Sequence, residues 1–504
     1  MHRQLVILTF VLLTATAAHA AKVPPEVALL EALKQQHWDA AETILANRVN
    51  VNAPEPDGST ALQWAVHFDR TDLAGRLIRA GANVNAATDL GVSALTLACE
   101  NANPGMVTLL LQAGAHPNGA PGALPPIMVA SRSGNPDVVA ALLARGADAN
   151  AVENARQQTA LMWAVANSHP QVVSVLLRAG ARVNARSSTQ ANVVQRGNRY
   201  AGVASREEGL ANRGVAEVTL GGSTALLFAA RVGDLDSARL LVEAHADIND
   251  ASPDGTSALV TAAHSGQGAV AAFLIEKGAD VNADAGGYTA LHAAVLRGDR
   301  ELVSMLLDRG ANTKAVLRRG TASRRYSRDY AFNEAWVGAT PFWLASRFAE
   351  VDIMRTLLAH GAKATVAAGD GTNPVIAVIT AGVDNGPSAS DRRERRLDPF
   401  DITALAENRG AFEKEVLNTV QVAVDAGVDV NAINNAGDTA MHQAAARGFT
   451  TVIQFLSDHG ARFDMKNKRG LTPLALTVSR RAADDAPWLA KANALLRSLG
   501  AKEE

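Results

Sequence analysis

The chain has 504 residues, more than one ordinary globular core accommodates, and 48% of them are hydrophobic. Aromatic residues make up only 4%, which favours a thin core of small and aliphatic side chains over one large domain. The formal net charge of −2 indicates neither a nucleic-acid-binding nor a membrane-surface protein. A single cysteine, Cys99, excludes an intramolecular disulfide framework, and its place in the pattern described below predicts a buried small hydrophobe.

Residues 1–20 have the three parts of a secretory signal peptide in the expected order. Arg3 provides a positive start, and an apolar run too short to span a bilayer comfortably extends from Leu5 to Ala18. Ala18, His19 and Ala20 then form the small-x-small pattern that precedes a cleavage site. We therefore expect cleavage after Ala20 and export of the mature chain.

Two short motifs alternate along the rest of the chain. A segment of the form Gly-x-Thr/Ser-Ala-Leu-x-x-Ala, or a close variant, recurs, for example at 287–294 and 437–444. The second motif, Gly-Ala-x-x-Asn, begins at Gly81, Gly114 and Gly146, which are 33 and 32 positions apart. A fixed period of this size predicts a linear array of structural repeats instead of separate domains.

The segment from Gly287 to Asn312 shows what one repeat predicts. Thr289 is suited to cap the first helix, and Gly298 ends that helix. Leu302 and Leu306 lie at helical spacing in the second helix, which ends at Gly310, a position that favours a left-handed conformation. Two helices this short cannot bury their apolar faces alone, so neighbouring repeats must share one core.

These residues resemble a known family. The run Thr289 to Ala294, followed by Gly310 to Asn312, resembles the ankyrin consensus of a β-turn, two antiparallel helices and a hairpin return, and Thr439 to His442 repeats it. The resemblance implies an all-α solenoid of about twelve stacked ankyrin-type helix-turn-helix repeats with β-hairpin loops. His245 replaces the capping glycine of one repeat, a departure that allows a rearranged loop there.

Three insertions and two distinct ends divide the array. The segment 186–221 lacks helical periodicity, so we favour a long loop over the alternative of a degenerate repeat. The predicted segments are a signal peptide (1–20), an N-terminal capping repeat (21–57), repeats (58–185), an inserted loop (186–221), repeats (222–314), an inserted loop rich in arginine and aromatic residues (315–337), repeats (338–469) that contain a third inserted loop (383–413), and a C-terminal capping repeat (470–504).

The resemblance also implies where a partner would bind, because ankyrin-like proteins use hairpin tips and the exposed face of the first helix. The corresponding positions are His67, Phe68, Arg132, Arg231, His264, Arg297, Arg347, Phe348 and Arg447. Since arginine dominates this set, we expect a locally basic groove and a protein partner with acidic features. We expect the rings of Phe68 and Phe348 to be exposed unless a partner covers them.

The second insertion adds further candidates for partner binding. Its arginine and aromatic residues are types that dominate the energetics of protein interfaces. The candidates there are Arg324, Arg325, Tyr326, Tyr330 and Trp336.

Other residue patterns do not indicate chemistry. His292 and His442 lie in different repeats, at the slot where ankyrin-like proteins bridge neighbouring turns by hydrogen bonds, so we predict no metal site. Trp64 and Trp163 occupy an inward-facing slot and are predicted to be core residues. We expect no catalytic residues, no cofactor, no nucleic-acid partner and no membrane span after signal removal.

The sequence therefore favours a monomeric, non-catalytic scaffold or adaptor that binds another protein. Ankyrin-like proteins with a signal peptide are mostly bacterial, so we expect a periplasmic location ahead of an extracellular one. An alternative without a discrete ligand site is that the array helps assemble a larger envelope complex. Two alternatives with such a site also remain. One is an envelope enzyme with a site built in the insertions, although these contain neither histidine nor cysteine. The other is a binder of an anionic polymer through the arginine clusters, which would be strongly salt-dependent.

Overall fold

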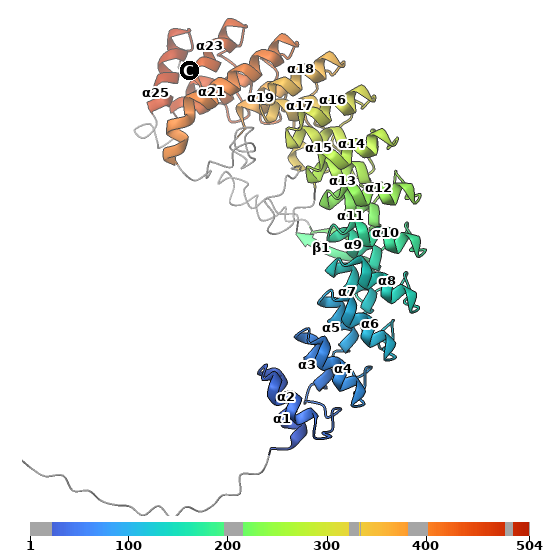
Figure 1. The fold of residues 1–504 in the computed structure, drawn as a ribbon. Coiled ribbons are helices and arrows are strands. Elements are labelled where there is room, and N and C mark those ends of the chain that lie inside the picture. The colour runs from blue at the N-terminus through green and yellow to red at the C-terminus, as the bar shows by residue number, and fades with distance from the viewer. Residues whose placement is uncertain are drawn as a thin grey trace, which may run out of the picture. The chain divides into compact units, whose positions relative to one another are not determined.

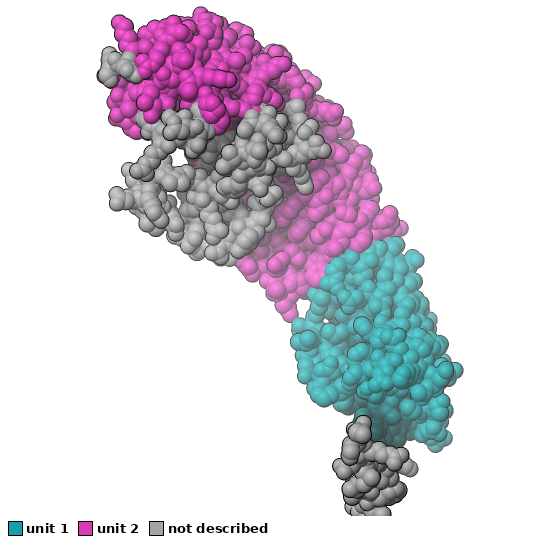
Figure 2. Space-filling view, turned by 90° about the vertical axis from the view of Figure 1, so that its left-hand side faces the viewer, with its two compact units in different colours: residues 1–148 teal, residues 149–504 magenta. Residues whose placement is uncertain are grey.

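The computed structural model describes residues 23–195, 215–321, 332, 334–381, 402–478 and 487–502. The chain divides into two compact units, unit 1 (residues 1–148) and unit 2 (residues 149–504), which Figure 2 distinguishes by colour. The described residues form twelve helix pairs and one two-stranded sheet. The predicted all-α solenoid of about twelve helix-turn-helix repeats is therefore confirmed.

Unit 1 consists of four helix pairs in its described part. Their helices are α1 (Pro25–Lys34), α2 (Trp38–Leu45), α3 (Ala61–His67), α4 (Thr71–Arg79), α5 (Ala94–Glu100), α6 (Pro104–Gln112), α7 (Pro126–Ser133) and α8 (Pro136–Ala144).

Unit 2 contains the other eight pairs, a two-stranded sheet and a short 3-10 helix. Its elements are α9 (Ala160–Ala166), α10 (Pro170–Arg178), β1 (Thr189–Gln195), β2 (Val215–Gly221), α11 (Ala225–Val232), α12 (Leu235–Glu243), α13 (Ala258–Ser265), α14 (Gly268–Glu276), α15 (Ala290–Arg297), α16 (Arg300–Asp308), η1 (Glu334–Trp336), α17 (Pro341–Arg347), α18 (Val351–Ala359), α19 (Pro374–Ile379), α21 (Ile402–Asp425), α22 (Ala440–Arg447), α23 (Thr450–Asp458), α24 (Pro473–Val478) and α25 (Pro487–Ser498).

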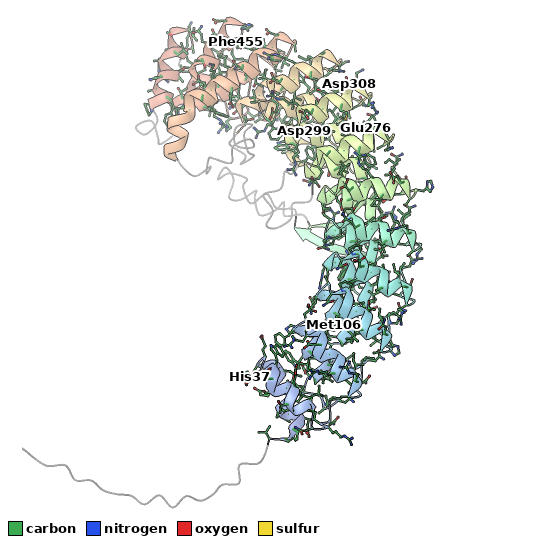
Figure 3. All side chains as sticks on the ribbon, viewed as in Figure 1. His37, Met106, Glu276, Asp299, Asp308 and Phe455 are labelled. Carbon is green, nitrogen blue, oxygen red and sulfur yellow. The ribbon has the colours of Figure 1, made fainter. Side chains whose placement is uncertain are left out.

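Within each unit the helices form two layers (Figure 1). The first helix of each pair packs against the first helix of the next pair, as α11, α13 and α15 do, and the second helices form a parallel series that includes α12, α14 and α16. Small and aliphatic side chains fill the space between the layers, for example Met106, which Figure 3 labels. Cys99 is fully buried, as predicted, and burial raises the pKa of its thiol.

The predicted helix signals are observed where the repeat pattern places them. The hydroxyl of Thr289 accepts a hydrogen bond from the backbone N–H of His292, and Asp299, labelled in Figure 3, accepts one from Leu302 at the start of α16. Gly298 and Gly310 have φ angles of 67° and 81°, in the left-handed region where glycine is favoured. Within this repeat, local sequence therefore sets both ends of α15 and α16.

The asparagine of the Gly-Ala-x-x-Asn motif connects consecutive hairpins. In unit 1, Asn85 donates from Nδ2 to the carbonyl of Gly114 at 3.0 Å and accepts from the backbone N–H of His116 at 2.8 Å. In unit 2, Asn282 donates to Gly310 at 3.1 Å and accepts from Asn312 at 2.7 Å. These paired bonds satisfy backbone groups beyond the helix ends and explain why the motif recurs with the repeat period.

The hairpin that contains His245 keeps the geometry of its neighbours, so the departure from glycine does not rearrange it. His245 adopts a φ of 65°, close to that of the capping glycines. Asn184 still donates to the carbonyl of His245, at 3.3 Å, and accepts from the N–H of Asp247. The stack thus holds a side chain in a conformation that glycine adopts with less strain.

Replacing His245 by glycine is therefore expected to raise the free energy of unfolding by about 1 kcal/mol, through relief of the left-handed conformation. Urea denaturation of the two proteins would measure the difference. The matched control is Gly278→Ala, at an equivalent position with a φ of 90°, which should lower stability by a similar amount. Equal stability of His245→Gly and the unmodified chain would contradict the expectation.

The first insertion is built on a β-hairpin base in the described residues. Strands β1 and β2 pair antiparallel, with Thr189 opposite Gly221 and Gln195 opposite Val215. Arg186 fixes this base: it donates to the carbonyls of Gly222 and Ala251, at 2.8 and 3.0 Å, and forms an ion pair with the buried carboxylate of Asp250. The described ends of the segment are strands, so they do not form a degenerate helical repeat.

The third insertion differs from the predicted inserted loop. Helix α21 begins at Ile402 and continues to Asp425, so residues 402–413 lengthen the second helix of that repeat. Arg409, in this added part, lies over the rings of Phe449 and Trp488, at 5.1 and 4.7 Å from their centroids. These contacts tie the added turns to the last repeats of unit 2.

Candidate functional site

The nine predicted first-helix residues all lie where a first helix ends and the chain turns toward the second helix. The structure separates the nine positions into exposed side chains, side chains that join repeats, and rings that are half-buried or buried.

The exposed group consists of His67, Arg132 and Arg231, with Phe68 half-buried beside His67. In unit 1, Arg132 forms a 3.2 Å ion pair with Glu100, the corresponding residue of the preceding repeat. In unit 2, the guanidinium of Arg231 lies 5.8 Å from the ring centroid of Phe228. These positions agree with the expectation of accessible side chains at the first-helix ends.

Three other arginines join repeats. Arg297 donates from Nε to the carbonyl of His264 at 2.7 Å, and Arg347, only 4% exposed, donates to the carbonyl of Ala377 at 3.3 Å. Arg447 donates to the carbonyls of Thr380 and Ala381, at 3.0 and 3.2 Å.

These four bonds reach carbonyls at or near the C-terminal ends of helices in neighbouring repeats, where carbonyls lack a backbone N–H partner from their own helix. The guanidinium groups keep their charge in these bonds, and only Arg132 is paired with a carboxylate, that of Glu100. The basic groove and an acidic partner therefore stay predictions. The sequence feature that indicates such a bond between repeats is a long donor side chain at the last position of a first helix.

His264 belongs to an aromatic cluster formed with the second insertion. Phe332 of the insertion is 2% exposed, and its ring centroid lies 4.7 Å from that of Tyr288, 6.1 Å from His264 and 6.5 Å from His292. Backbone bonds from Leu317 to Ala339 and from Gly338 to Leu317, both 2.8 Å, hold the two ends of the insertion together. The described part of this insertion therefore packs against the first helices.

The expectations for Phe348 and Trp336 require correction. Phe348 is 3% exposed because its ring packs edge-on against Trp336, with centroids 5.5 Å apart. Trp336 is itself 6% exposed and lies 6.4 Å from the ring of Trp343. Neither ring offers a surface to a partner, because each contributes to the core where the second insertion meets the repeats.

The remaining candidates of the second insertion, Arg324, Arg325, Tyr326 and Tyr330, lie outside the described residues. Two arginines before them are described. Arg318 forms an ion pair with Asp284, and Arg319 donates from Nε to the carbonyl of Gly286 at 2.8 Å. Both attach the insertion to the preceding hairpins.

A second aromatic cluster lies at the N-terminal end of unit 1. The Phe68 ring centroid is 5.7 Å from that of Trp38, 6.1 Å from Trp64 and 4.8 Å from His67. Trp64 is half-buried, so its assignment to the core was only partly right, and its Nε1 donates to Glu55 at 2.7 Å. Trp38 was not among the predicted site residues, because its repeat lacks the opening motif that aligns the others.

The two histidines of the repeat motif bridge neighbouring repeats, as the resemblance implied. In each, Nδ1 lies near the preceding threonine: 2.9 Å from Thr289 Oγ1 in His292 and 2.8 Å from Thr439 Oγ1 in His442. Their Nε2 atoms reach the carbonyls of Ala339 and Leu471, at 3.4 and 3.1 Å.

Burial lowers the pKa of His292 to about 4, partly opposed by hydrogen bonds to the Ala339 and Ala315 carbonyls and by the charge of Asp284. Burial also lowers the pKa of His442. Both histidines therefore act as neutral hydrogen-bonding bridges.

Metal-binding clusters and membrane-spanning helices are both absent from the residues that the structure describes. No group of three or more histidine, cysteine, aspartate or glutamate side chains there is arranged to hold a metal ion. No helix in the same residues combines the length and apolar character needed to cross a bilayer.

Comparisons with known proteins agree with the repeat architecture. The family model described as ankyrin repeats (3 copies) matches residues 29–120, 121–187, 226–316 and 410–497, more than half of the chain. Ankyrin repeats generally mediate protein–protein interaction.

Individual relatives match only parts of this chain. It is 34% identical over 201 residues to the B-cell lymphoma 3 protein homolog of Mus musculus, covering 39% of this chain and 41% of that protein. It is 27% identical over 219 residues to Ankyrin repeat and SOCS box protein 16 of Homo sapiens, covering 41% of this chain and 43% of that protein. The chain thus spans less than half the length of these relatives. The crystal structure of the human ASB11 ankyrin repeat domain matches at 24% identity and a TM-score of 0.40, covering 50% of this chain and 98% of that domain.

Proposed function

Because the chain belongs to the ankyrin-repeat family, we propose that it is a non-catalytic scaffold or adaptor that binds another protein as a monomer. Binding involves the accessible side chains at the first-helix ends, including His67, Phe68, Arg132 and Arg231. It also involves residues 322–331 of the second insertion. The chain acts after export, in the periplasm.

The observation that carries this proposal is how the polar groups of the repeats are used. The asparagines of the hairpins, the bridging histidines and three of the first-helix arginines hold the repeats together. Other side chains at equivalent positions, among them His67 and Arg231, are exposed. A stack with hydrogen-bonded joints and varied exposed side chains at regular intervals is suited to binding a macromolecule.

The second insertion can be shortened without disturbing its anchors. The backbone N–H of Thr321 donates to the carbonyl of Phe332 at 3.0 Å, and the N–H of Phe332 donates to Thr321 Oγ1 at 2.9 Å. Replacing residues 322–331 by a short Gly-Ser linker therefore keeps Leu317, Phe332 and Trp336 in the core. Deletion of the whole segment 315–337 would remove these buried side chains. A loss of binding by that variant could then not be distinguished from misfolding.

The proposed function is tested by crosslinking capture from an envelope extract of the source organism, with the mature chain and the variant that lacks 322–331. The proposal expects a protein that the mature chain retains after a high-salt wash and that the variant retains less. Capture only of polyanions that salt releases would contradict it and favour the polymer-binding alternative. Absence of any retained protein with the mature chain would also contradict the proposal.

Export is tested separately from binding. Residues 1–20 lie outside the described residues, and the proposal rests on the signal pattern that ends at Ala20. Expression of the full chain in a bacterium should give a periplasmic protein that begins at Ala21 by N-terminal sequencing. A variant with Ala18 and Ala20 replaced by lysine should keep the uncleaved N-terminus. Recovery of the uncleaved, unmodified chain in the cytoplasm would contradict export.

A further inference from the structure

The aromatic cluster at the N-terminal end of unit 1 consists of Trp38, Trp64, His67 and Phe68, which we call the N-terminal aromatic cluster. Trp38 begins α2, directly after His37, which Figure 3 labels, and the other three come from the end of α3. Trp38 and Phe68 meet edge to face, with an interplanar angle of 67°, whereas Trp64 and Phe68 stack at 22°. The cluster thus joins the turns of two consecutive repeats.

No ring of this cluster is fully buried by the described residues of unit 1. Trp38, Trp64 and Phe68 are half-buried and His67 is exposed. Phe348, the residue of unit 2 that corresponds to Phe68, provides an internal comparison, because Trp336 of the second insertion covers its ring there and Phe348 is 3% exposed. The comparison indicates that an added aromatic or large apolar side chain is a suitable cover for such rings.

The charges around the cluster define the partner further. Lys34 lies 5.7 Å from the Trp64 ring centroid and pairs with Glu55 at 2.8 Å. Arg70 lies 4.6 Å from the Trp38 ring centroid and pairs with Asp72 at 2.8 Å. Both cations beside the rings are therefore already matched by a carboxylate.

Additional carboxylates surround these two ion pairs. The hydrogen bond and charge of Glu55 raise the pKa of Lys34, with smaller contributions from Glu31 and Asp57. The hydrogen bond to Asp72 raises the pKa of Arg70, with smaller contributions from Glu42 and Asp39. Glu42 also pairs with Arg76 at 3.1 Å, so three of these six carboxylates are matched by the three cations. The other three, Glu31, Asp39 and Asp57, give the rim around the rings an excess of negative charge.

We propose that the N-terminal aromatic cluster binds a protein segment in which an aromatic or large apolar side chain is flanked by lysine or arginine. The apolar side chain covers the half-buried rings, and the flanking cations meet the acidic rim that includes Glu31 and Asp39. This inference rests on the proposed function as a protein-binding scaffold. It gives the partner the opposite charge from the one that the arginine content of the first-helix ends led us to expect.

Short fluorescein-labelled peptides test the inference by fluorescence anisotropy with the mature chain. One series has a central tryptophan flanked by lysine and arginine, a second replaces the cations by glutamate, and a third replaces the tryptophan by alanine. The basic peptide with tryptophan is expected to bind at least about tenfold more tightly than either of the others. Equal affinities, or tightest binding of the acidic series, would overturn the inference.

Matched variants test whether the peptide binds at the N-terminal aromatic cluster. Phe68→Ala should weaken the basic peptide by about tenfold, whereas Phe455→Ala, at a half-buried ring on α23 that Figure 3 labels, should not. Asp39→Lys should also weaken binding, whereas Asp236→Lys should not. Asp39 and Asp236 are both exposed in the first turn of a second helix. Each change therefore removes a similar favourable interaction between the carboxylate and the helix dipole.

Circular dichroism checks that each variant is folded. If Asp39→Lys binds the basic peptide as tightly as the unmodified chain does, the cluster is not the site. If the mature chain still retains a protein partner in the capture experiment, the scaffold function stands although this inference fails.

Discussion

Replacing His292 and His442 together by glutamine is expected to leave stability near neutral pH almost unchanged and to reduce the loss of stability in acid. Gln63 shows that glutamine fits this slot: its Oε1 accepts from the N–H of Thr60 at 2.7 Å, and its Nε2 donates to the carbonyl of Val92 at 2.7 Å. The same two-sided bridge is made by His292 between Thr289 and Ala339. Glutamine therefore keeps the bridge between repeats and removes the imidazole group that takes up a proton in acid.

The direction of the pH dependence follows from the pKa of His292, which burial lowers from 6.5 to about 4. Below pH 6.5 the unfolded chain binds a proton at this site more readily than the folded chain does, so acid favours unfolding. The contribution of neutral His292 to the free energy of unfolding is complete above pH 6.5 and is lost progressively as the pH falls to about 4. The loss amounts to about 3 kcal/mol for His292, and His442, whose pKa is also lowered, adds to it.

Urea denaturation between pH 7 and pH 4 would measure this effect. The unmodified chain should lose stability more steeply than the double glutamine variant as the pH falls below 6.5. His116→Gln is the control, because the side chain of His116 is exposed and it should not change the slope. Identical slopes for the unmodified chain and the double variant would show that these two histidines do not govern acid stability.

The fold was predictable because each repeat encodes its own helix ends. Thr289, Gly298 and Gly310 fix local backbone geometry within one repeat, and the same signals return at a constant spacing. A single sequence is enough to detect such a pattern, since every repeat serves as a comparison for the others. The predicted burial of Cys99 succeeded for the same reason.

The candidate site was harder to predict, because it depends on contacts between repeats. The repeat pattern places Arg231 and Arg347 at equivalent positions, yet Arg231 is exposed and Arg347 is 4% exposed, with a bond to the carbonyl of Ala377. The difference arises from what each neighbouring repeat places beside the guanidinium. Position within the repeat therefore identifies the first-helix ends but not whether a side chain there remains accessible.

The insertions show the same limit more strongly. Nothing in the periodicity indicates that Arg186 fixes a hairpin base through Asp250, or that residues 402–413 extend a helix. Composition suggested an exposed interface at Trp336, since arginine and aromatic residues are common at interfaces. Aromatic residues also form cores, and only the packing of Trp336 against Trp343 and Phe348 distinguishes the two roles.

Phe332→Ala and Trp336→Ala are each expected to destabilise unit 2 by about 3–5 kcal/mol, the range typical of large aromatic truncations in cores. Phe332 is 2% exposed and fills the space between Tyr288, His264 and His292, whereas Trp336 packs against Trp343 and Phe348. Either truncation leaves a cavity lined by aromatic rings from the first helices. Urea denaturation, followed by tryptophan fluorescence for Phe332→Ala, which keeps all six tryptophans, and by circular dichroism for both variants, would measure the loss.

Two matched changes separate a core role for these rings from a role in binding. Replacement of residues 322–331 by a short linker should cost little stability, because the bonds between Thr321 and Phe332 remain. Phe455→Ala removes a half-buried ring from α23 and should cost less than either core truncation. If Trp336→Ala were as stable as the unmodified chain but lost a captured partner, Trp336 would be an interface residue after all. Loss of stability with Trp336→Ala, combined with full stability of the linker variant, would establish that Trp336 is part of the core and that residues 322–331 are not needed for folding.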